Sequence, residues 1–99
     1  MDFDLKIFPA AQDDYRQIVE RINTLPSGAA APYFEQFNEM FEALREKPGA
    51  RPVAKDLQLR LRGYRAATVK EYTAVYVLNG NTVEIRRILF TRRQHEGIL

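Results

Sequence analysis

The last third of the chain contains three strand-like runs, spanning residues 64–90, that are separated by two very short turns. The turns fall at residues 70–71 and 79–81, and the second carries an Asn-Gly pair, which is a strong hairpin signal. Strands joined by turns this short must pair antiparallel. The chain is therefore restricted to folds that are built around an antiparallel sheet.

The run between the two turns carries apolar side chains on both of its faces. Because side chains alternate along a strand, Tyr72, Ala74 and Tyr76 face one side of the sheet, while Val75 and Val77 face the other. This pattern is typical of a central strand that is covered on both sides.

The flanking runs predict two further strands. In residues 82–90 the same alternation places Val83, Ile85 and Leu89 on one face, and residues 64–69 form the strand before the first turn.

The segment before this region alternates as well. Residues 57–62 read LQLRLR, which predicts that a strand begins here, with Gly63 as a bulge or a break. Residues 48–55 form a loop by their Pro and Gly content.

A short alternating strand at residues 3–7 and two amphipathic helices come first in the chain. Pro9 suits the first turn of a helix, and Asp13 and Asp14 complement the positive helix N-terminus. The apolar stripe of the first helix comprises Ala11, Tyr15, Ile18, Val19, Ile22 and Leu25. That of the second comprises Ala30, Tyr33, Phe34, Phe37, Met40, Phe41 and Leu44. The aromatic stripe could line a ligand cleft, but its helical spacing favours core packing.

A Pro/Gly loop at residues 25–28 joins the helices, so we expect an antiparallel helical hairpin. The element order is then β-α-α-β-β-β. This order predicts an α+β fold in which the helical hairpin packs on one face of a small, mainly antiparallel sheet. No linker or internal repeat divides the chain, so residues 1–99 are expected to form a single domain.

Composition excludes several classes of site. The chain has no cysteine, which removes disulfides, thiolate metal sites and cysteine nucleophiles, and its one histidine, His95, excludes a multi-histidine metal site within one chain. No metal and no cofactor are expected. No apolar run approaches the roughly 20 residues of a membrane helix. Without a signal-peptide pattern either, a cytoplasmic protein with no membrane partner is expected.

Charge is distributed unevenly along the chain. Residues 1–50 carry five Lys/Arg and nine Asp/Glu, whereas residues 51–99 carry ten and four. This asymmetry indicates either one face for an anionic partner such as nucleic acid or a solvated surface of uneven charge.

Basic side chains of the second half are the candidate binding groups, because guanidinium groups make bidentate contacts with phosphate oxygens. Alternation places Arg60 and Arg62 on one strand face, and only one of Arg86 and Arg87 should join them. The candidate target-binding residues are Lys55, Arg60, Arg62, Lys70 and Arg86.

His95 is either a base poised near neutral pH or an exposed histidine at a frayed terminus. The arginines next to it disfavour its cationic form. Tyr64, Tyr72 and Tyr76 could stack on bases, although core packing is favoured for the latter two.

The residues together resemble the RelE/ParE superfamily of bacterial toxins from type II toxin–antitoxin modules. The stretch LKIFPAAQDDYRQIVERI is similar to the family's strand and proline-initiated helix. The stretch GYRAATVKEYTAVYVLNGNTVEIRRILFTRRQHEGIL is similar to its C-terminal signature, an Arg-bearing strand, a Tyr-rich strand, a tight turn and a strand that runs into an arginine pair.

The resemblance implies a cognate antitoxin that neutralises the chain by covering it with an extended or helical segment. Operator DNA would be bound only through that antitoxin. Two targets are implied, because RelE-like members cut mRNA on the ribosome and ParE-like members poison DNA gyrase. We expect antitoxin contact at an exposed sheet edge and over the basic face.

For the nuclease branch, the resemblance places catalytic roles on Arg65, Arg92, Arg93 and His95. That branch typically has an arginine after the tyrosine of the central strand, whereas Tyr72 is followed here by Thr73. The ending with an arginine pair is similar to the ParE side, which needs no catalytic set. The sequence therefore favours a growth-arresting toxin of the ParE type, with a RelE-like nuclease or an inactive antitoxin-binding relative as alternatives.

Overall fold

A four-stranded sheet with the strand order β1-β4-β3-β2 forms the centre of the computed structural model, which describes residues 2–93. β2 pairs antiparallel with β3, and β3 with β4, as the sequence predicted, whereas β1 pairs parallel with β4. The strands are β1 (Asp4–Ile7), β2 (Arg65–Val69), β3 (Tyr72–Asn79) and β4 (Thr82–Phe90).

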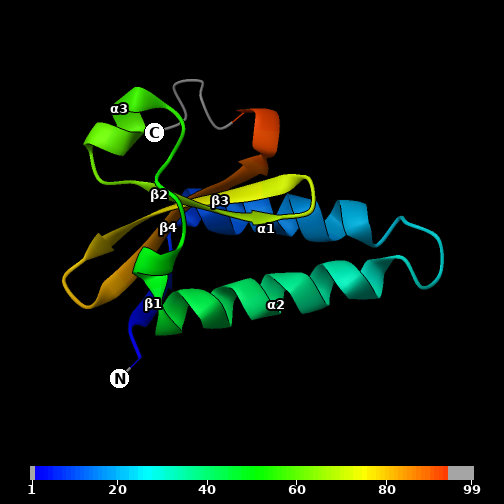
Figure 1. The fold of residues 1–99 in the computed structure, drawn as a ribbon. Coiled ribbons are helices and arrows are strands. Elements are labelled where there is room, and N and C mark those ends of the chain that lie inside the picture. Colours follow the sequence, from blue (N-terminus) through cyan, green and yellow to red (C-terminus); the bar gives the residue numbers. More distant parts are fainter. Residues whose placement is uncertain (1, 94–99) are drawn as a thin grey trace.

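Two long helices lie together on one face of the sheet, and a short helix lies on the other (Figure 1). The expected helical hairpin is formed by α1 (Pro9–Ile22) and α2 (Ala30–Glu46). The short helix is α3 (Leu57–Leu61), and two 3-10 turns, η1 (Pro48–Ala50) and η2 (Thr91–Arg93), complete the described elements. No helix among residues 2–93 is long and apolar enough to cross a membrane.

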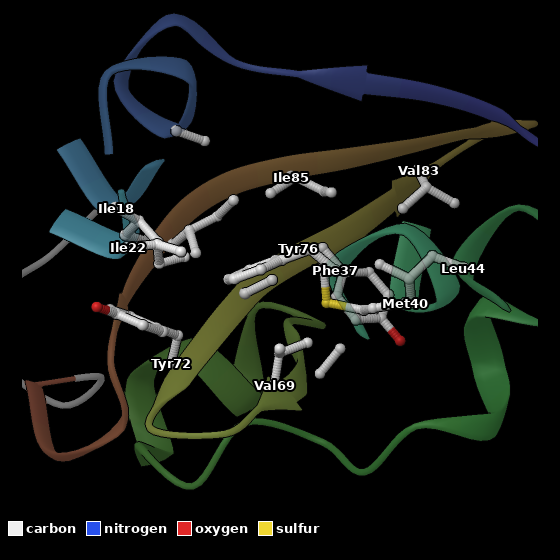
Figure 2. Close-up of a cluster of buried hydrophobic side chains, with 14 residues drawn as sticks. Ile18, Ile22, Phe37, Met40, Leu44, Val69, Tyr72, Tyr76, Val83 and Ile85 are labelled. Atoms are coloured by element: carbon white, nitrogen blue, oxygen red, sulfur yellow. The ribbon is translucent and has the colours of Figure 1, made fainter. Parts of the chain in front are cut away.

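The main core fills the space between the helical hairpin and the sheet (Figure 2). Ile18 and Ile22 from α1 and Phe37 and Leu44 from α2 are almost completely buried there. The aromatic stripe of α2 is therefore core, because Phe37 packs against Tyr72 at a ring-centroid distance of 6.1 Å.

β3 is covered on both faces, as predicted. Tyr72, Ala74 and Tyr76 belong to the main core under the helical hairpin. Val75 and Val77 belong to a second, smaller cluster on the face of the sheet that α3 covers. The other members of that cluster are Ala54, Leu59 and Tyr64.

The prediction that a strand begins at residue 57 is wrong, because residues 57–61 form α3. The side chain of Asp56 accepts hydrogen bonds from the backbone N–H groups of Gln58 and Leu59, which caps the helix N-terminus. The alternating leucines do not form a buried strand face. Leu59 is buried, but Leu57 and Leu61 are 54% and 73% exposed.

The prediction that Leu89 lies on the same face of β4 as Val83 and Ile85 is also wrong. The register between β3 and β4 shifts between Val75 and Tyr76, which leaves one extra residue in β4. This bulge reverses the alternation beyond it. Ile88 and Phe90, rather than Leu89, therefore pack with the main core.

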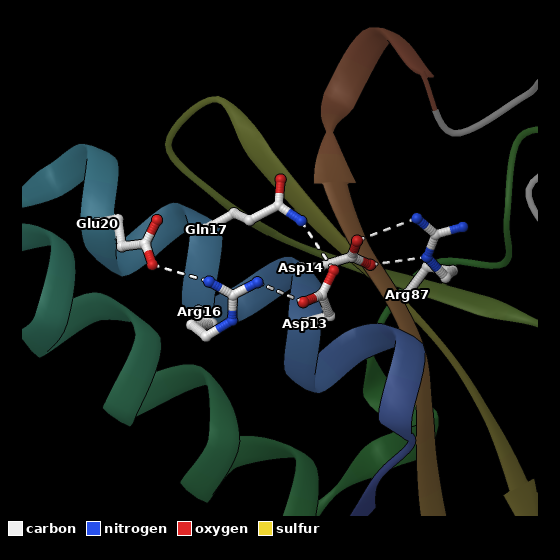
Figure 3. A network of polar contacts seen from close by, with 6 residues as sticks. All are labelled: Asp13, Asp14, Arg16, Gln17, Glu20 and Arg87. Carbon is white, nitrogen blue, oxygen red and sulfur yellow. Dashed lines mark hydrogen bonds and ion pairs between the residues drawn. The ribbon is translucent and has the colours of Figure 1, made fainter.

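The start of α1 differs from expectation in one respect. Pro9 occupies the first turn as predicted, but no acidic residue lies in that turn. Asp13 and Asp14 come after it, and both make side-chain contacts (Figure 3). Asp13 binds Arg16, whereas Asp14 binds Arg87 of β4. The main interactions of these carboxylates are therefore the ion pairs with the two arginines, and not the interaction with the helix dipole.

Candidate functional site

A pocket of about 680 Å³ lies beside the turn that joins β2 to β3, where this turn meets the end of β4 and η2. The backbone N–H of Thr91 donates a hydrogen bond of 2.8 Å to the carbonyl oxygen of Glu71, which ties η2 to the turn. We call this space the basic pocket; it is lined by Arg21, Lys55, Thr68, Lys70, Glu71, Phe90, Thr91 and Arg92.

Four cationic side chains from distant parts of the sequence line the basic pocket. Arg21 comes from the end of α1, Lys55 precedes α3, Lys70 lies in the turn and Arg92 lies in η2. Among the described lining residues, Glu71 is the one acidic side chain. The pocket therefore has a positive potential and is suited to hold phosphate or carboxylate groups.

Two of these cations are positioned by aromatic rings. The guanidinium carbon of Arg21 lies 4.7 Å from the ring centroid of Phe90. Nζ of Lys70 lies 5.0 Å from the ring centroid of Tyr33. Such contacts stabilise a cation by roughly 0.5–1 kcal/mol at exposed sites, so they favour particular placements of the two charges.

Lys70 adopts a backbone conformation that is uncommon for a residue with a side chain. Its φ is +51°, in the left-handed region that favours glycine. A two-residue hairpin turn requires such a φ, and here a lysine occupies the position. The conformation costs about 1–2 kcal/mol relative to glycine, which marks Lys70 as a functional candidate.

Three threonine hydroxyl groups form a chain beside the basic pocket. Oγ1 of Thr73 lies 2.9 Å from Oγ1 of Thr91 and 3.4 Å from that of Thr68. Thr73 is completely buried, while Thr68 and Thr91 line the pocket. The chain therefore connects β2 and β3 to η2 through hydroxyl groups.

Glu71 is engaged by a neighbouring phenol. The hydroxyl of Tyr33 donates to the Glu71 carboxylate, at 2.8 and 2.9 Å from its two oxygens. This hydrogen bond to Glu71 raises the pKa of Tyr33 above its ordinary value. Tyr33 therefore stays neutral at physiological pH and acts as a donor that anchors the turn to α2.

The basic pocket brings together three of the basic residues that the sequence singled out, which are Lys55, Lys70 and Arg92. Arg93 lies in η2, and its side chain and all of His95 lie outside the described part of the chain.

Arg65 does not line the basic pocket. Its Nη1 donates a hydrogen bond of 2.6 Å to the carbonyl oxygen of Arg51. Arg65 also pairs with Tyr76 in the sheet and lowers the pKa of that phenol, against the larger opposing effect of burial. These contacts indicate that Arg65 fixes the loop before α3 to the sheet.

Arg62 and Arg86 converge on Tyr64, away from the basic pocket. Nη1 of Arg86 donates to the Tyr64 hydroxyl at 3.1 Å, and the guanidinium of Arg62 lies 5.8 Å from the Tyr64 ring centroid. Arg87 instead binds Asp14. The prediction that Arg60 and Arg62 share a strand face is wrong, because Arg60 lies in α3 and Arg62 is the residue that caps its C-terminus.

The three tyrosines considered for base stacking are all buried. Tyr64 is 4%, Tyr72 is 3% and Tyr76 is 0% exposed. A base cannot stack on rings that protein atoms cover on both sides, so these tyrosines are core residues.

Sequence reasoning missed Arg21, Thr68, Thr91 and Phe90. Arg21 sits in the acidic half of the chain and reaches the pocket only because α1 ends beside Phe90. The threonines carry no motif. Their role depends on the register that aligns Thr68 with Thr73, which becomes visible only in the folded sheet.

Comparison with known proteins identifies the family. The sequence matches the family model described as ParE toxin of type II toxin–antitoxin system, parDE, over residues 5–95. No curated protein matches the sequence significantly.

Several solved structures share the fold. A chain of the chromosomal ParDE toxin–antitoxin system from P. aeruginosa aligns with a TM-score of 0.68 and 18% identity, covering 89% of this chain and 95% of that one. YafQ from E. coli aligns with a TM-score of 0.63 and 17% identity, covering 92% and 96%. A chain of the toxin–antitoxin complex RelBE2 from Mycobacterium tuberculosis aligns with a TM-score of 0.57 and 22% identity, covering 91% and 99%. The fold and the family match agree, and the chain belongs to the ParE toxins of type II toxin–antitoxin systems, within the RelE/ParE superfamily.

Proposed function

We propose that the chain arrests growth by binding DNA gyrase through the basic pocket, without cutting RNA. In this proposal the cations of the pocket hold an anionic partner group, which is either a carboxylate of gyrase or a phosphate of the DNA that gyrase holds. The family match and the positive potential of the pocket support this function.

Thr73 is the observation that carries the proposal. The nuclease branch of the superfamily typically has an arginine at this position. Here the residue is completely buried, and its hydroxyl is engaged with Thr91 at 2.9 Å. The site thus lacks a cation that RNA cleavage would use to stabilise developing charge on phosphate.

The described part of the pocket also offers little for proton transfer. RNA cleavage by the 2′-hydroxyl needs a general base and a general acid near the scissile phosphate. The carboxylate among the described lining residues, Glu71, accepts hydrogen bonds from Tyr33. Lysine, arginine and threonine side chains are suited to hold a phosphate rather than to relay its protons.

Purified gyrase provides the direct test. The chain should stabilise cleaved complexes of gyrase and supercoiled plasmid, seen as linear DNA after detergent and protease treatment. The double variant Lys55→Ala/Arg92→Ala should lose this effect. Arg60→Ala removes a nearby cation that does not line the basic pocket, and it should retain the effect. Absence of cleaved complexes with the wild-type chain would refute the gyrase target.

A RelE-like mRNA endonuclease that acts on the ribosome is the second candidate. One observation favours it, because Lys55, Lys70 and Arg92 converge in one pocket and His95 follows Arg92 by three positions in the sequence. Primer extension on mRNA from cells that express the chain distinguishes the two functions. Codon-linked cuts that disappear in His95→Ala would establish the nuclease, and their absence is expected.

We further propose that a cognate antitoxin neutralises the chain and supplies the DNA-binding domain that represses the operon. The solved relatives described as toxin–antitoxin systems support this partnership. Expression in the cytoplasm without the antitoxin should arrest growth, and co-expression of the antitoxin from the adjacent reading frame should restore it. Normal growth without the antitoxin would identify an inactive antitoxin-binding relative.

A further inference from the structure

The four cations of the basic pocket have no carboxylate partner among residues 2–93. Arginines outside the pocket differ in this respect. Arg16 forms ion pairs with Asp13 and Glu20, and Arg87 forms one with Asp14. Like charges that gather in one place repel each other, so the pocket favours an anionic ligand that supplies the missing counter-charge.

Glu71, the acidic side chain of the described lining, leaves this charge in place. Its two carboxylate oxygens accept the hydroxyl of Tyr33, at 2.8 and 2.9 Å. None of the four pocket cations lies within ion-pair distance of the Glu71 carboxylate. Four cations and one carboxylate give the described lining a net charge of +3. A ligand with a single negative charge would leave most of this charge uncompensated.

A row of three aromatic rings orders two of the cations before any ligand binds. Arg21 lies against Phe90, whose ring stacks on that of Tyr72 at a centroid distance of 5.0 Å. Tyr72 contacts Tyr33 at 6.3 Å, and Lys70 lies against the ring of Tyr33. Because Tyr72 is buried, the row is anchored in the core. A ligand that contacts both cations therefore meets side chains that have already lost part of their freedom.

The threonine hydroxyl groups add a neutral donor to the pocket. Thr73 contacts Thr91 and Thr68 through its hydroxyl, and these two contacts use two of the three hydroxyl protons. Since Thr73 is completely buried, its own proton is used within the chain. One proton of Thr68 or Thr91 is therefore left to donate to a ligand in the pocket.

Two linked phosphates match these donors better than simpler anions do. One carboxylate offers about four acceptor sites, fewer than the N–H donors of two guanidinium and two ammonium groups. A nucleic-acid strand carries one charge on each phosphate and spaces these charges along its backbone. A diphosphate instead concentrates several charges and many acceptor oxygens in a small volume, and the pocket of about 680 Å³ has room for it.

We propose that the basic pocket is a binding site for a free diphosphate group, and that this small ligand competes with gyrase for the pocket. The cations of the pocket neutralise the diphosphate, and the free hydroxyl proton donates to one of its oxygens. Either inorganic pyrophosphate or a nucleoside diphosphate supplies this chemistry. The diphosphate site follows from the pocket itself, and only the competition rests on the proposed function.

Calorimetric titration of the full chain without divalent cations tests the ligand class. Pyrophosphate should bind about tenfold more tightly than inorganic phosphate or citrate, which presents carboxylates instead. It should also shift the amide resonances of Thr68, Lys70 and Thr91 in the ¹⁵N-labelled chain. Equal affinity for citrate, tighter binding of a single-stranded DNA oligonucleotide, or no binding of pyrophosphate at millimolar concentration would each overturn the proposal.

ADP distinguishes the two sources of the diphosphate. Tighter binding of ADP than of pyrophosphate assigns a nucleoside diphosphate, because the nucleoside then contributes contacts of its own. An affinity for ADP equal to or below that for pyrophosphate assigns the inorganic group.

Protein variants locate the site by changing its charge in both directions. Lys55→Ala/Arg92→Ala should weaken pyrophosphate binding about tenfold or more. Lys6→Ala/Lys47→Ala removes the same charge from exposed positions outside the pocket and should preserve binding.

Glu71→Gln tests the opposite direction. It removes the negative charge of the lining but keeps an acceptor for Tyr33, so it should tighten binding about threefold. Glu42→Gln makes the same change at an exposed position of α2 and should have no effect. Equal affinities of the two glutamine variants would contradict the placement of the ligand.

Competition is measured with immobilised gyrase in the absence of divalent cations. Pyrophosphate should displace the bound chain, and binding that persists at saturating pyrophosphate would refute the competition. A chain that binds pyrophosphate but not gyrase would refute the proposed function and leave the diphosphate site standing. A chain that binds gyrase but not pyrophosphate would refute the diphosphate site alone.

Discussion

Asp14 of α1 and Arg87 of β4 join the first helix to the last strand through a two-point contact (Figure 3). Oδ2 of Asp14 accepts from Nε of Arg87 at 2.7 Å, and Oδ1 accepts from Nη2 at 3.0 Å. The same Oδ2 accepts the backbone N–H of Ile88 at 3.0 Å, directly after the bulge. The contact with Asp14 raises the pKa of Arg87, so this guanidinium group stays charged at any physiological pH. The bulge is thereby held against the helical hairpin.

Removal of this carboxylate should destabilise the chain strongly. The Asp14 side chain is only 11% exposed, so Asp14→Ala leaves Arg87 without that counter-charge and should lower the free energy of unfolding by about 3 kcal/mol. Asp14→Asn keeps an acceptor for Ile88 and should recover part of the loss. Urea denaturation measures both variants. Asp13→Ala removes a neighbouring but exposed carboxylate, and an equal loss there would contradict the assignment.

Tyr76 should make the chain sensitive to alkaline pH. Burial raises its pKa to about 12, and its hydroxyl donates to the carbonyl oxygen of Pro48. Unfolded tyrosines titrate near 10, so the folded state holds this proton more tightly. The resulting stabilisation is complete below about pH 10 and is lost as the pH rises toward 12.

The variant Tyr76→Phe isolates this effect. At pH 7 it should lose roughly 1–3 kcal/mol of stability, because the buried Pro48 carbonyl loses its donor. The difference from wild type should then narrow between about pH 10 and 12, since only the wild type carries this titrating group. Urea melts at several pH values give the comparison, and a gap that stays constant to pH 12 would contradict the role of Tyr76.

Lys70 should separate stability from function. Its φ of +51° is strained for a residue with a Cβ atom, so glycine relieves this strain and alanine does not. We therefore expect Lys70→Gly to be about 1 kcal/mol more stable than Lys70→Ala, while both lose the charge in the basic pocket. Thermal unfolding and growth arrest on expression measure the two properties. If the alanine variant unfolded at the same temperature as the glycine variant, the strain would be refuted.

Thr73 tests the choice between binding and catalysis. Thr73→Val keeps the shape of the side chain but removes the buried hydroxyl, and Thr68 and Thr91 remain able to bond with water in the open pocket. The cost should be about 1 kcal/mol or less. A binding toxin should retain growth arrest with this variant. Arrest lost in a folded Thr73→Val chain would instead assign the hydroxyl a chemical role.

The parts of the fold that the sequence predicted depend on long periodic patterns. The two helical stripes and the two-sided apolar pattern of β3 each extend over many residues, so their buried faces were readable without tertiary information. The Asn-Gly turn was equally local, because Gly80 adopts a φ of +61° in the hairpin.

The sequence did not predict α3, because the alternating pattern of its five residues is too short to distinguish a helix from a strand. Five residues with alternating leucines fit both structures, and the deciding feature was the capping side chain of Asp56. The basic pocket was predicted only in part. Lys55, Lys70 and Arg92 were chosen by charge, whereas Arg21 arrives there through the packing of α1, for which no local pattern exists.

The extra residue in β4 has a consequence for how relatives should be aligned. Every position of β4 after the bulge, through Phe90, faces the side of the sheet that the extra residue sets, whatever kind of residue is present there. A relative without the bulge would present the residues at these positions to the opposite side of the sheet, even if the two sequences were identical there. Equivalent residues at the end of this strand are therefore found by superposing the strands and counting from the bulge, and a sequence alignment alone would pair residues that point in opposite directions.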